Sequence, residues 1–204
     1  MRRRPYKLLT ESSKLEITGS IIEHCAADVE VQGSLTHGNH SWTLDEVCYF
    51  EVHLMNWAEG KISIGLTSED YPIMHPGYYP ISYAYHTDTG SIFSNSDEKE
   101  WGPSAYTGDV VGWGFLPRIN AIFFTKNANL LGAPFTVDPA TEVLYPSIGL
   151  QQHGQKVRIE FGADPESLVF PLHDISGMEP MITATFDDTE SEEESYRDYR
   201  YSSG

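Results

Sequence analysis

The stretch "GDVVGWGFLPRINAIFFTKNANLLG", residues 108–132, decides the fold class. Two apolar runs, 110–115 and 121–126, are rich in β-branched and aromatic residues and predict two neighbouring strands. Gly108 and Asp109 are expected to turn the chain before the first strand, because Gly tolerates positive φ and Asp closes a turn with its own carboxylate. A phosphate-binding role for these glycines would need a helix after them, and no helical pattern follows.

Phe123 and Phe124 are neighbours on the second predicted strand, so their side chains point to opposite faces of the sheet. One of the two rings is therefore expected in the core. The other faces a second layer or a loop.

Short strands of this kind recur along the whole chain. No window of helical length carries apolar residues at i, i+3, i+4 and i+7. Gly65, in the middle of one strand, indicates a close approach of another backbone segment or a bulge. Ten or more short strands separated by turns predict an all-β protein built as a sandwich of antiparallel sheets. Besides the opening pair, short pieces of a strand meander are expected between 15 and 42. Further expected strands lie at 47–55, 62–66, 82–95 (as a hairpin), 144–150 and 156–162.

Composition limits the class of protein and its partners. The chain has 204 residues, of which 40% are hydrophobic, enough for one domain with a core. A net charge of -17 argues against nucleic acid and anionic membrane surfaces, because phosphates would be repelled. No segment approaches the roughly 20 apolar residues that span a bilayer. Direct membrane insertion is therefore not expected.

Two cysteines, Cys25 and Cys48, are too few for the disulfide framework of a small secreted domain. A single disulfide between them is left open. The basic N-terminus is not followed by an apolar stretch of signal-peptide length. We therefore expect an intracellular protein, cytoplasmic or nuclear.

The chain divides into three parts. Residues 1–14 are polar and basic and are expected to be flexible, residues 15–170 form the domain, and 171–204 form an extension. Within the extension, 186–204 is rich in acids and poor in aliphatic residues, which predicts disorder. Thr189 and Ser191 precede acidic residues, as acid-directed kinases prefer, and are candidate phosphorylation sites.

Seven sequence blocks follow one another along the chain: "YFEV", "ISIGL", "PGYYPISYAYHTDTG", "YTGDVVGWGF", "IFFTKNANLLG", "LYPSIGL" and "VRIEFG". In order, spacing and residue type they resemble the successive strands of a SPRY domain over residues 43–170. The chain is most similar to the branch of Ran-binding protein M and the fungal SPRY ubiquitin-ligase adaptors. Two positions depart from that branch. Tyr78 stands where the family usually has Trp, and Ala128 stands where a Gly is usual, although Asn127 or Asn129 could supply the positive φ of the turn.

The resemblance implies a bent sandwich of two antiparallel sheets, of the concanavalin-like jelly-roll type. It also implies a non-catalytic module without a cofactor, which binds a peptide or loop of a partner protein through loops at one end of the sandwich. Such a module serves as an adaptor or subunit of a larger assembly, for example a ubiquitin-ligase or scaffold complex.

The loop 67–80 is the main candidate for contact with a partner, because it is long, rich in Pro and aromatic residues, and without a period. Its tyrosines offer rigid aromatic area with hydroxyl groups. Alternatively, one or two of them fill the end of the sandwich, and family position favours Tyr78 for that role. Trp57 and Trp101 lie in turns that could rim the same surface, and the family places the loop at 151–153 near the binding end. The candidate binding residues are Tyr71, Tyr78, Tyr79, Trp57, Trp101, Gln151 and His153.

Other functional classes find less support. A carbohydrate-binding module is the main alternative, because aromatic loops stack on sugars, but such modules usually accompany secretion or calcium-binding carboxylates. A glycosidase would need paired carboxylates, and Glu51 and Glu160 have none at strand spacing. There is no Gly-x-Ser-x-Gly elbow. His37 and His40 have the spacing of metal ligands but no second pair, so no metal site is predicted.

Overall fold

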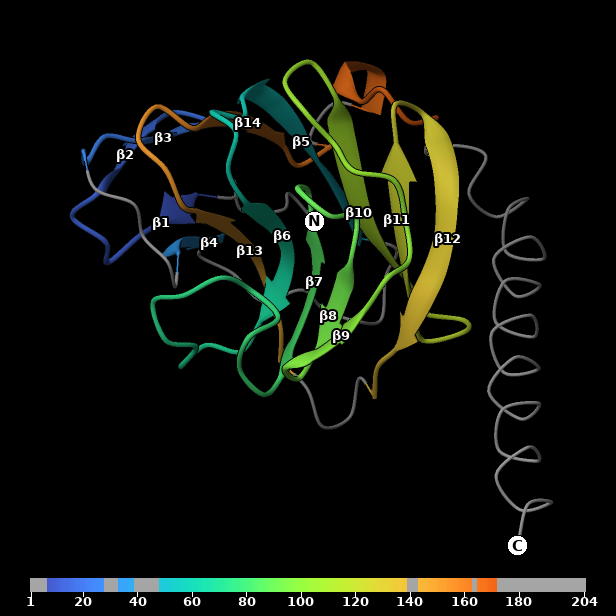
Figure 1. Ribbon diagram of the computed structural model, residues 1–204. Coiled ribbons are helices and arrows are strands. Elements are labelled where there is room, and N and C mark those ends of the chain that lie inside the picture. The colour runs from blue at the N-terminus through green and yellow to red at the C-terminus, as the bar shows by residue number, and fades with distance from the viewer. Residues whose placement is uncertain (1–6, 28–32, 39–47, 139–142, 163–164, 172–204) are drawn as a thin grey trace, which may run out of the picture.

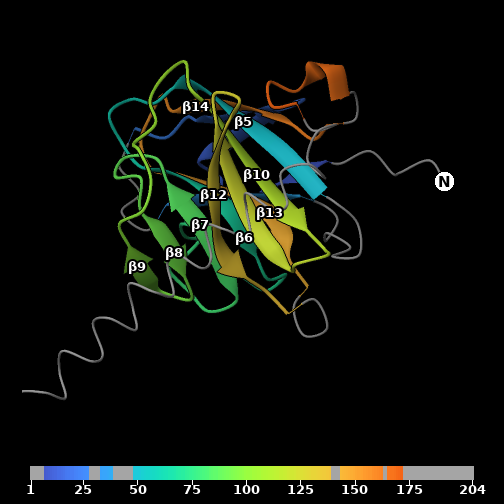
Figure 2. The same cartoon turned by 90° about the vertical axis from the view of Figure 1, so that its right-hand side faces the viewer.

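The computed structural model describes residues 7–27, 33–38, 48–138, 143–162 and 165–171. In these ranges, two antiparallel sheets of seven strands each pack face to face (Figure 1; Figure 2). A single 3-10 turn, η1 (Pro165–Ser167), follows the last strand of this part. The predicted all-β sandwich is confirmed. Within the same ranges, the structure has no helix of the length and apolarity that a membrane crossing requires.

Each sheet mixes strands from distant parts of the chain. Sheet A has the order β1 (Leu8–Leu9), β4 (Ser34–Gly38), β13 (Tyr145–Leu150), β6 (Ile62–Thr67), β7 (Ser82–His86), β8 (Ile92–Ser94) and β9 (Asp97–Lys99). Sheet B has the order β12 (Asn129–Thr136), β11 (Ala121–Lys126), β10 (Val110–Leu116), β5 (Cys48–Asn56), β14 (Lys156–Glu160), β3 (Ile21–His24) and β2 (Leu15–Thr18).

The opening stretch forms the hairpin β10–β11 in sheet B. Trp113 lies opposite Phe124 and Gly114 opposite Phe123. Gly108 has φ of +94°, and a carboxylate oxygen of Asp109 accepts the amide of Tyr106 at 2.9 Å, so both residues turn the chain as expected.

The main core lies between the inner faces of the two sheets. Phe124 of sheet B is fully buried, and its ring centroid lies 5.6 Å from that of Tyr85 in sheet A. Tyr83 of sheet A and Phe135 of sheet B make a second such contact at 5.3 Å. Phe123 points to the outer face of sheet B and packs against Phe170. The prediction that Phe123 and Phe124 point to opposite faces, with one ring in the core, is confirmed.

Two local features differ from, or add to, what the sequence indicated. Residues 8–9, inside the segment expected to be flexible, pair with β4 at the edge of sheet A. A two-residue strand is too short to show a period, which is why the sequence did not reveal it. An ideal Cβ on Gly65 would lie 1.9 Å from the carbonyl oxygen of Tyr83, which is the close approach expected there. Cys25 is exposed and Cys48 is buried, and no disulfide joins them.

Several predictions fall on residues outside the described ranges. These are the disordered tail at 186–204, the candidate phosphorylation sites Thr189 and Ser191, and His40 of the histidine pair together with the side chain of His37.

Candidate partner-binding surface

At one end of the sandwich, the turn between β5 and β6 lies against the loop between β13 and β14. The fully buried side chain of Gln155 ties the two together. Its Oε1 accepts the amides of Gln151 and Gln152 at 2.6 and 3.0 Å. Its Nε2 donates to the carbonyl oxygens of Trp57 and Lys61 at 3.0 and 3.2 Å. One amide side chain therefore uses four hydrogen bonds to fix both loops.

Three further contacts strengthen this junction. The amide of Lys61 donates to Oε1 of Gln151 at 3.0 Å. Nδ2 of Asn56 donates to the carbonyl oxygen of Gly154 at 2.7 Å. An ideal Cβ on Gly60 would lie only 2.7 Å from the side chain of Gln152, so the Gln152 side chain packs closely on this turn. The two loops behave as one preformed unit.

Tyr78 reaches the same end from the loop between β6 and β7. Its hydroxyl oxygen accepts a hydrogen bond from Nζ of Lys61, which also lies 5.0 Å from the centre of the ring. The half-buried ring packs on His86 and Phe93, with centroids 5.1 and 5.4 Å away. Tyr78 therefore forms part of the floor, as its family position implied, and its exposed part completes the surface.

The aromatic pair Trp57 and Tyr106 lies beside this floor. Their centroids are 4.9 Å apart with the rings nearly perpendicular, and Tyr106 is 47% exposed. The amide of Trp57 donates to Oγ1 of Thr107 at 2.9 Å, which holds the turn against the chain before β10. We call the surface formed by Trp57, Lys61, Tyr78, Tyr106, Gln151 and His153 the tip surface.

The sequence had suggested that the loop between β6 and β7 lies at the binding end of the sandwich. In the structure, this loop (68–81) instead crosses the outer face of sheet A. Nδ1 of His75 lies 2.5 Å from Oγ of Ser63 on β6. An ideal Cβ on Gly77 would lie 2.4 Å from Cβ of Phe93 on β8. The loop is a close-packed cover, and only Tyr78 joins the tip surface.

Tyr71 lies inside this loop rather than on its surface. It is 8% exposed, and its hydroxyl donates to the carbonyl oxygen of His75 at 2.8 Å and accepts the amides of Tyr78 and Tyr79, each at 3.0 Å. Burial raises the pKa of the Tyr71 hydroxyl. Tyr71 therefore organises the loop instead of offering a contact.

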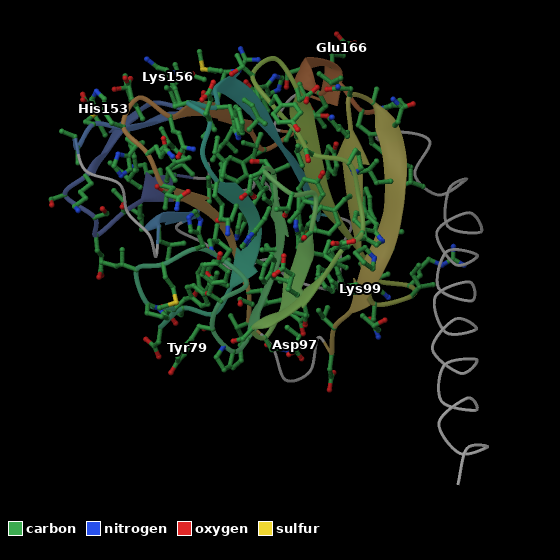
Figure 3. All side chains as sticks on the ribbon, viewed as in Figure 1. Tyr79, Asp97, Lys99, His153, Lys156 and Glu166 are labelled. Carbon is green, nitrogen blue, oxygen red and sulfur yellow. The ribbon has the colours of Figure 1, made fainter. Side chains whose placement is uncertain are left out.

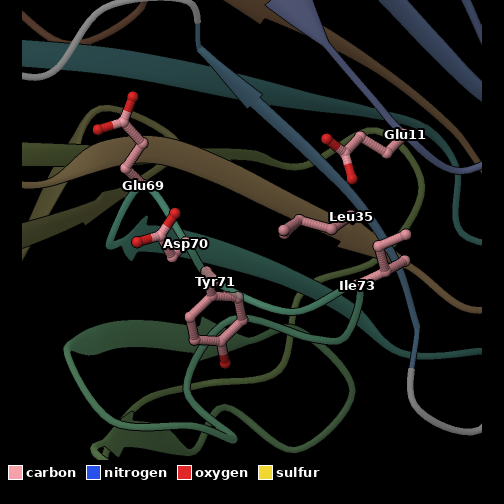
Figure 4. A pocket seen from close by; sticks show the side chains of 6 residues that line it. All are labelled: Glu11, Leu35, Glu69, Asp70, Tyr71 and Ile73. Carbon is pink, nitrogen blue, oxygen red and sulfur yellow. The ribbon is translucent and has the colours of Figure 1, made fainter.

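Tyr71 also lines a small hollow of about 230 Å³ together with Leu35, Ile73 and three acidic residues (Figure 4). Its hydroxyl points away from the three carboxylates, Glu11, Glu69 and Asp70, in agreement with its bonds inside the loop. This hollow is separate from the tip surface.

Two other expected residues also lie elsewhere. Tyr79 is 51% exposed, and Figure 3 shows it at the opposite end of the molecule from His153. Trp101 packs against Phe124 and Tyr85 with centroids 5.6 and 6.4 Å away, and lines a hollow of about 430 Å³ beside β8 and β9. The structure thus brings together Trp57, Tyr78, Gln151 and His153, and leaves Tyr71, Tyr79 and Trp101 apart.

Lys61, Tyr106 and Gln155 belong to this end of the sandwich but were not among the residues that the sequence indicated. Lys61 sits in an ordinary turn, and Gln155 is one of several glutamines in its loop. Their importance arises from partners far away in the chain, and no local pattern reveals such partners.

Several buried polar side chains lie near this surface. Ser63 and His75 have the composition of a nucleophile–base pair, but both side chains are fully buried. Burial, with the nearby His86 and Lys61, lowers the pKa of His75 well below its usual value. Burial lowers the pKa of His86 to about 3, so both rings are neutral. In the described ranges no cluster of three or more His, Cys, Asp or Glu residues is placed to hold a metal ion.

Curated relatives match the region that carries this surface. The dual specificity protein kinase splA of Dictyostelium discoideum is 40% identical over 118 residues, which are 55% of this chain and 5% of the kinase. Ran-binding proteins 9/10 homolog of Drosophila melanogaster is 39% identical over 57% of this chain and 12% of its own length. Human Ran-binding protein 9 is 37% identical over 63% of this chain and 17% of its own length. The chain thus matches a small part of each relative.

Solved structures agree with the sequence matches. A crystal structure of a human SPRY domain superposes with a TM-score of 0.63 at 27% identity, covering 79% of this chain and 99% of that one. The SPRY domain of human HERC1 gives a TM-score of 0.58 at 18% identity, covering 76% and 98%, and supports the fold alone. The SPRY domain family itself matches residues 47–164, more than half of the chain. This chain therefore belongs to the SPRY domain family.

Proposed function

We propose that the domain binds a short peptide or an exposed loop of a partner protein through the tip surface, without catalysis. The observation that carries the proposal is the Gln155 junction, which holds two loops about 95 residues apart in one fixed arrangement. A rigid surface loses little conformational entropy on binding, so its contacts are converted more fully into affinity. Membership of a family of protein-interaction modules supports the same function.

The composition of the tip surface suits a polypeptide ligand. Tyr78 and Trp57 supply aromatic area, the type of side chain that is enriched at binding hot spots. His153 is exposed, and Lys61 and Gln151 lie half-buried beside it, so donors and acceptors surround the rings. Such polar groups can fix the direction of an extended peptide by bonding to its main chain.

The test is a peptide-library selection on the immobilised full chain, followed by titration of an enriched peptide. We expect Tyr78→Ala to weaken binding at least tenfold, which corresponds to about 1.4 kcal/mol. His153→Ala should also weaken binding, and because its side chain is exposed it should leave the melting temperature unchanged. Equal affinity for wild type and both variants would show that the tip surface is not the site.

Tyr79→Ala is the matched control. Tyr79 is the next residue in the same loop and is more exposed than Tyr78, but it lies away from the tip surface (Figure 3). Its replacement should change affinity less than twofold.

A carbohydrate ligand is the alternative. Sugars stack on flat ring faces, but Trp57 and Tyr106 stand at 80° to each other and offer no shared platform. A glycan array separates the two ideas, because a clear hit that Trp57→Ala erases would favour the sugar.

We also propose that the domain acts inside the cell as an adaptor or subunit of a larger assembly, such as a ubiquitin-ligase or scaffold complex. This rests on the matched Ran-binding relatives, in which the matched region is a small part of a longer chain. Size-exclusion chromatography of the endogenous protein should then show a mass well above that of the isolated chain.

A further inference from the structure

Two glycines of β10 leave space on the outer face of sheet B, and we call the site lined by Tyr49, Glu51 and Phe123 the groove. Gly112 lies opposite Glu51 of β5, and Gly114 lies opposite Tyr49. An ideal Cβ on Gly112 would meet the Tyr49 hydroxyl at 1.9 Å, and one on Gly114 would meet the ring of Phe123 at 2.1 Å. The glycines therefore let the two rings lie flat across the strand, stacked with an interplanar angle of 8°.

A segment of the chain that follows the last described strand fills this groove. The ring of Phe170 is 1% exposed and lies 5.6 Å from Tyr49 and 6.3 Å from Phe123. Leu168 packs against the same cluster. In Figure 1 and Figure 2, η1, which directly precedes these residues, lies beside β5 and β10.

Glu51 holds the main chain of this segment. Its carboxylate is 1% exposed and accepts the amides of Val169 and Phe170 at 2.8 and 2.7 Å. The Tyr49 hydroxyl donates to the same carboxylate at 3.0 Å, and that hydroxyl lies 2.8 Å from Oγ1 of Thr125. One carboxylate that accepts two consecutive amides requires a bent backbone, because consecutive amides of an extended strand point to opposite sides, and residues 169 and 170 form such a bend. The rings of Tyr49 and Phe123 contact the Phe170 side chain.

The attachment of the segment is narrow. Val169 is 43% exposed, and Glu166 and Ser167 face outward as well. Burial is concentrated in Phe170 and Leu168, so the segment follows a Leu-x-Phe pattern in which the middle residue faces solvent. So short a segment stays bound because the chain tethers it to the domain, which gives the segment a high effective concentration at the groove.

We propose that the groove on sheet B is a ligand site for a Leu-x-Phe segment, with Glu51 as its main-chain acceptor, and that residues 168–170 are its resident ligand. The site is distinct from the tip surface and does not depend on the function assigned to it. The ligand chemistry is an apolar peptide that bends so as to present two consecutive free amides to one carboxylate.

The test uses the full chain carrying Phe170→Ala and, as probe, a synthetic peptide of residues 165–171 at millimolar concentration. Backbone NMR shifts of Gly112, Gly114 and Thr125 report occupancy. We expect saturable shifts in the variant and at least tenfold weaker apparent binding to wild type, where the resident segment competes. A peptide with Phe170→Ala should produce no shifts. Equal response of variant and wild type, or no saturable shift, would overturn the proposal.

Adding Glu51→Gln to the Phe170→Ala chain should lower its affinity for the peptide at least tenfold, because one amide of the ligand loses a charged acceptor. Glu160→Gln is the matched control, since Glu160 lies opposite Glu51 on β14 but contacts Arg158 instead of the segment. Equal losses in the two variants would exclude the role of Glu51.

If the Phe170→Ala chain does not fold, hydrogen exchange of the wild-type chain shows whether the segment can leave the groove while the domain stays folded. The amides of Val169 and Phe170 should exchange at least tenfold faster than those of β10, through local opening of the segment. Exchange of all these amides at one common rate would mean that the segment leaves only when the domain unfolds, and the groove would not be a ligand site.

Discussion

Ala128 occupies a backbone position that the sequence family usually gives to glycine. It has φ of 64°, and Asn127 before it has φ of 49°, so both residues of the β11–β12 turn are left-handed. Asn tolerates this region, but a Cβ on any other residue costs about 1 kcal/mol there. Asn127 also donates to Asp109 at 2.7 Å and accepts the amide of Val110 at 2.8 Å, so it supplies more than its φ.

We therefore expect Ala128→Gly to raise the free energy of unfolding by about 0.5–1 kcal/mol, because it removes the strain at positive φ. Urea unfolding monitored by tryptophan fluorescence measures the change. Asn127→Gly is the comparison: it keeps the φ but loses both side-chain bonds, and should destabilise the domain. An Ala128→Gly chain no more stable than wild type would contradict the strain argument.

The neutral histidine His86 makes stability depend on pH. Burial lowers its folded pKa to about 3, below the usual value near 6.5 in the unfolded chain. The unfolded state thus binds more protons between these values, so stability is full above pH 6.5 and falls as the pH drops toward 3. Between pH 6.5 and pH 5, one such histidine lowers the free energy of unfolding by about 2 kcal/mol.

Thermal melting at several pH values should show this loss. His86→Gln retains a donor for the carbonyl oxygen of Pro76, which Nε2 of His86 contacts at 2.9 Å, but does not titrate. Its melting temperature should fall less steeply between pH 6.5 and 5. Parallel curves for the variant and wild type would mean that other groups cause the pH dependence.

Among the elements, the two tip loops depend on one another through Gln155. Replacing Gln155 with Ala leaves two amides and two carbonyl groups without their partners, and each unsatisfied buried group costs about 1–3 kcal/mol. With partial rescue by water, we expect Gln155→Ala to cost about 2–4 kcal/mol. Hydrogen exchange should accelerate at both 57–61 and 151–155.

Gln152→Ala serves as its control, because Gln152 lies in the same loop and its side chain lies against Gly60. It should cost less than about 1 kcal/mol. Faster exchange in only one loop of the Gln155→Ala chain would show that the loops are independent.

For the whole molecule, the strands were predictable where one face is apolar over several residues. The β10–β11 hairpin, the opposite faces of Phe123 and Phe124 and the close approach at Gly65 all follow from the period of two and from residue size. The path of the loop 68–81 was not predictable, because a Pro-rich segment without a period carries no information on direction. The role of Tyr71 depends on three bonds made inside that folded loop.

The site was predictable only in part, for the same reason. Residues 57 and 151 to 155 are close because their strands lie in sheets whose order follows no local rule. Family position indicated the loop at 151–153 and Tyr78. Nothing in the sequence singles out Gln155 as the residue that joins the loops.

The neighbouring rings Phe123 and Phe124 allow a test of how the whole molecule holds together. Phe124 touches Tyr85 of sheet A and joins both sheets in one core, whereas Phe123 contacts Tyr49 and Phe170 on the outer face of sheet B. Phe124→Ala should cost about 3–5 kcal/mol, and exchange should accelerate in both sheets together. Phe123→Ala should accelerate exchange first at Val169 and Phe170, whose groove it opens. If Phe124→Ala loosened sheet B while sheet A kept its protection, the two sheets would not share one cooperative core.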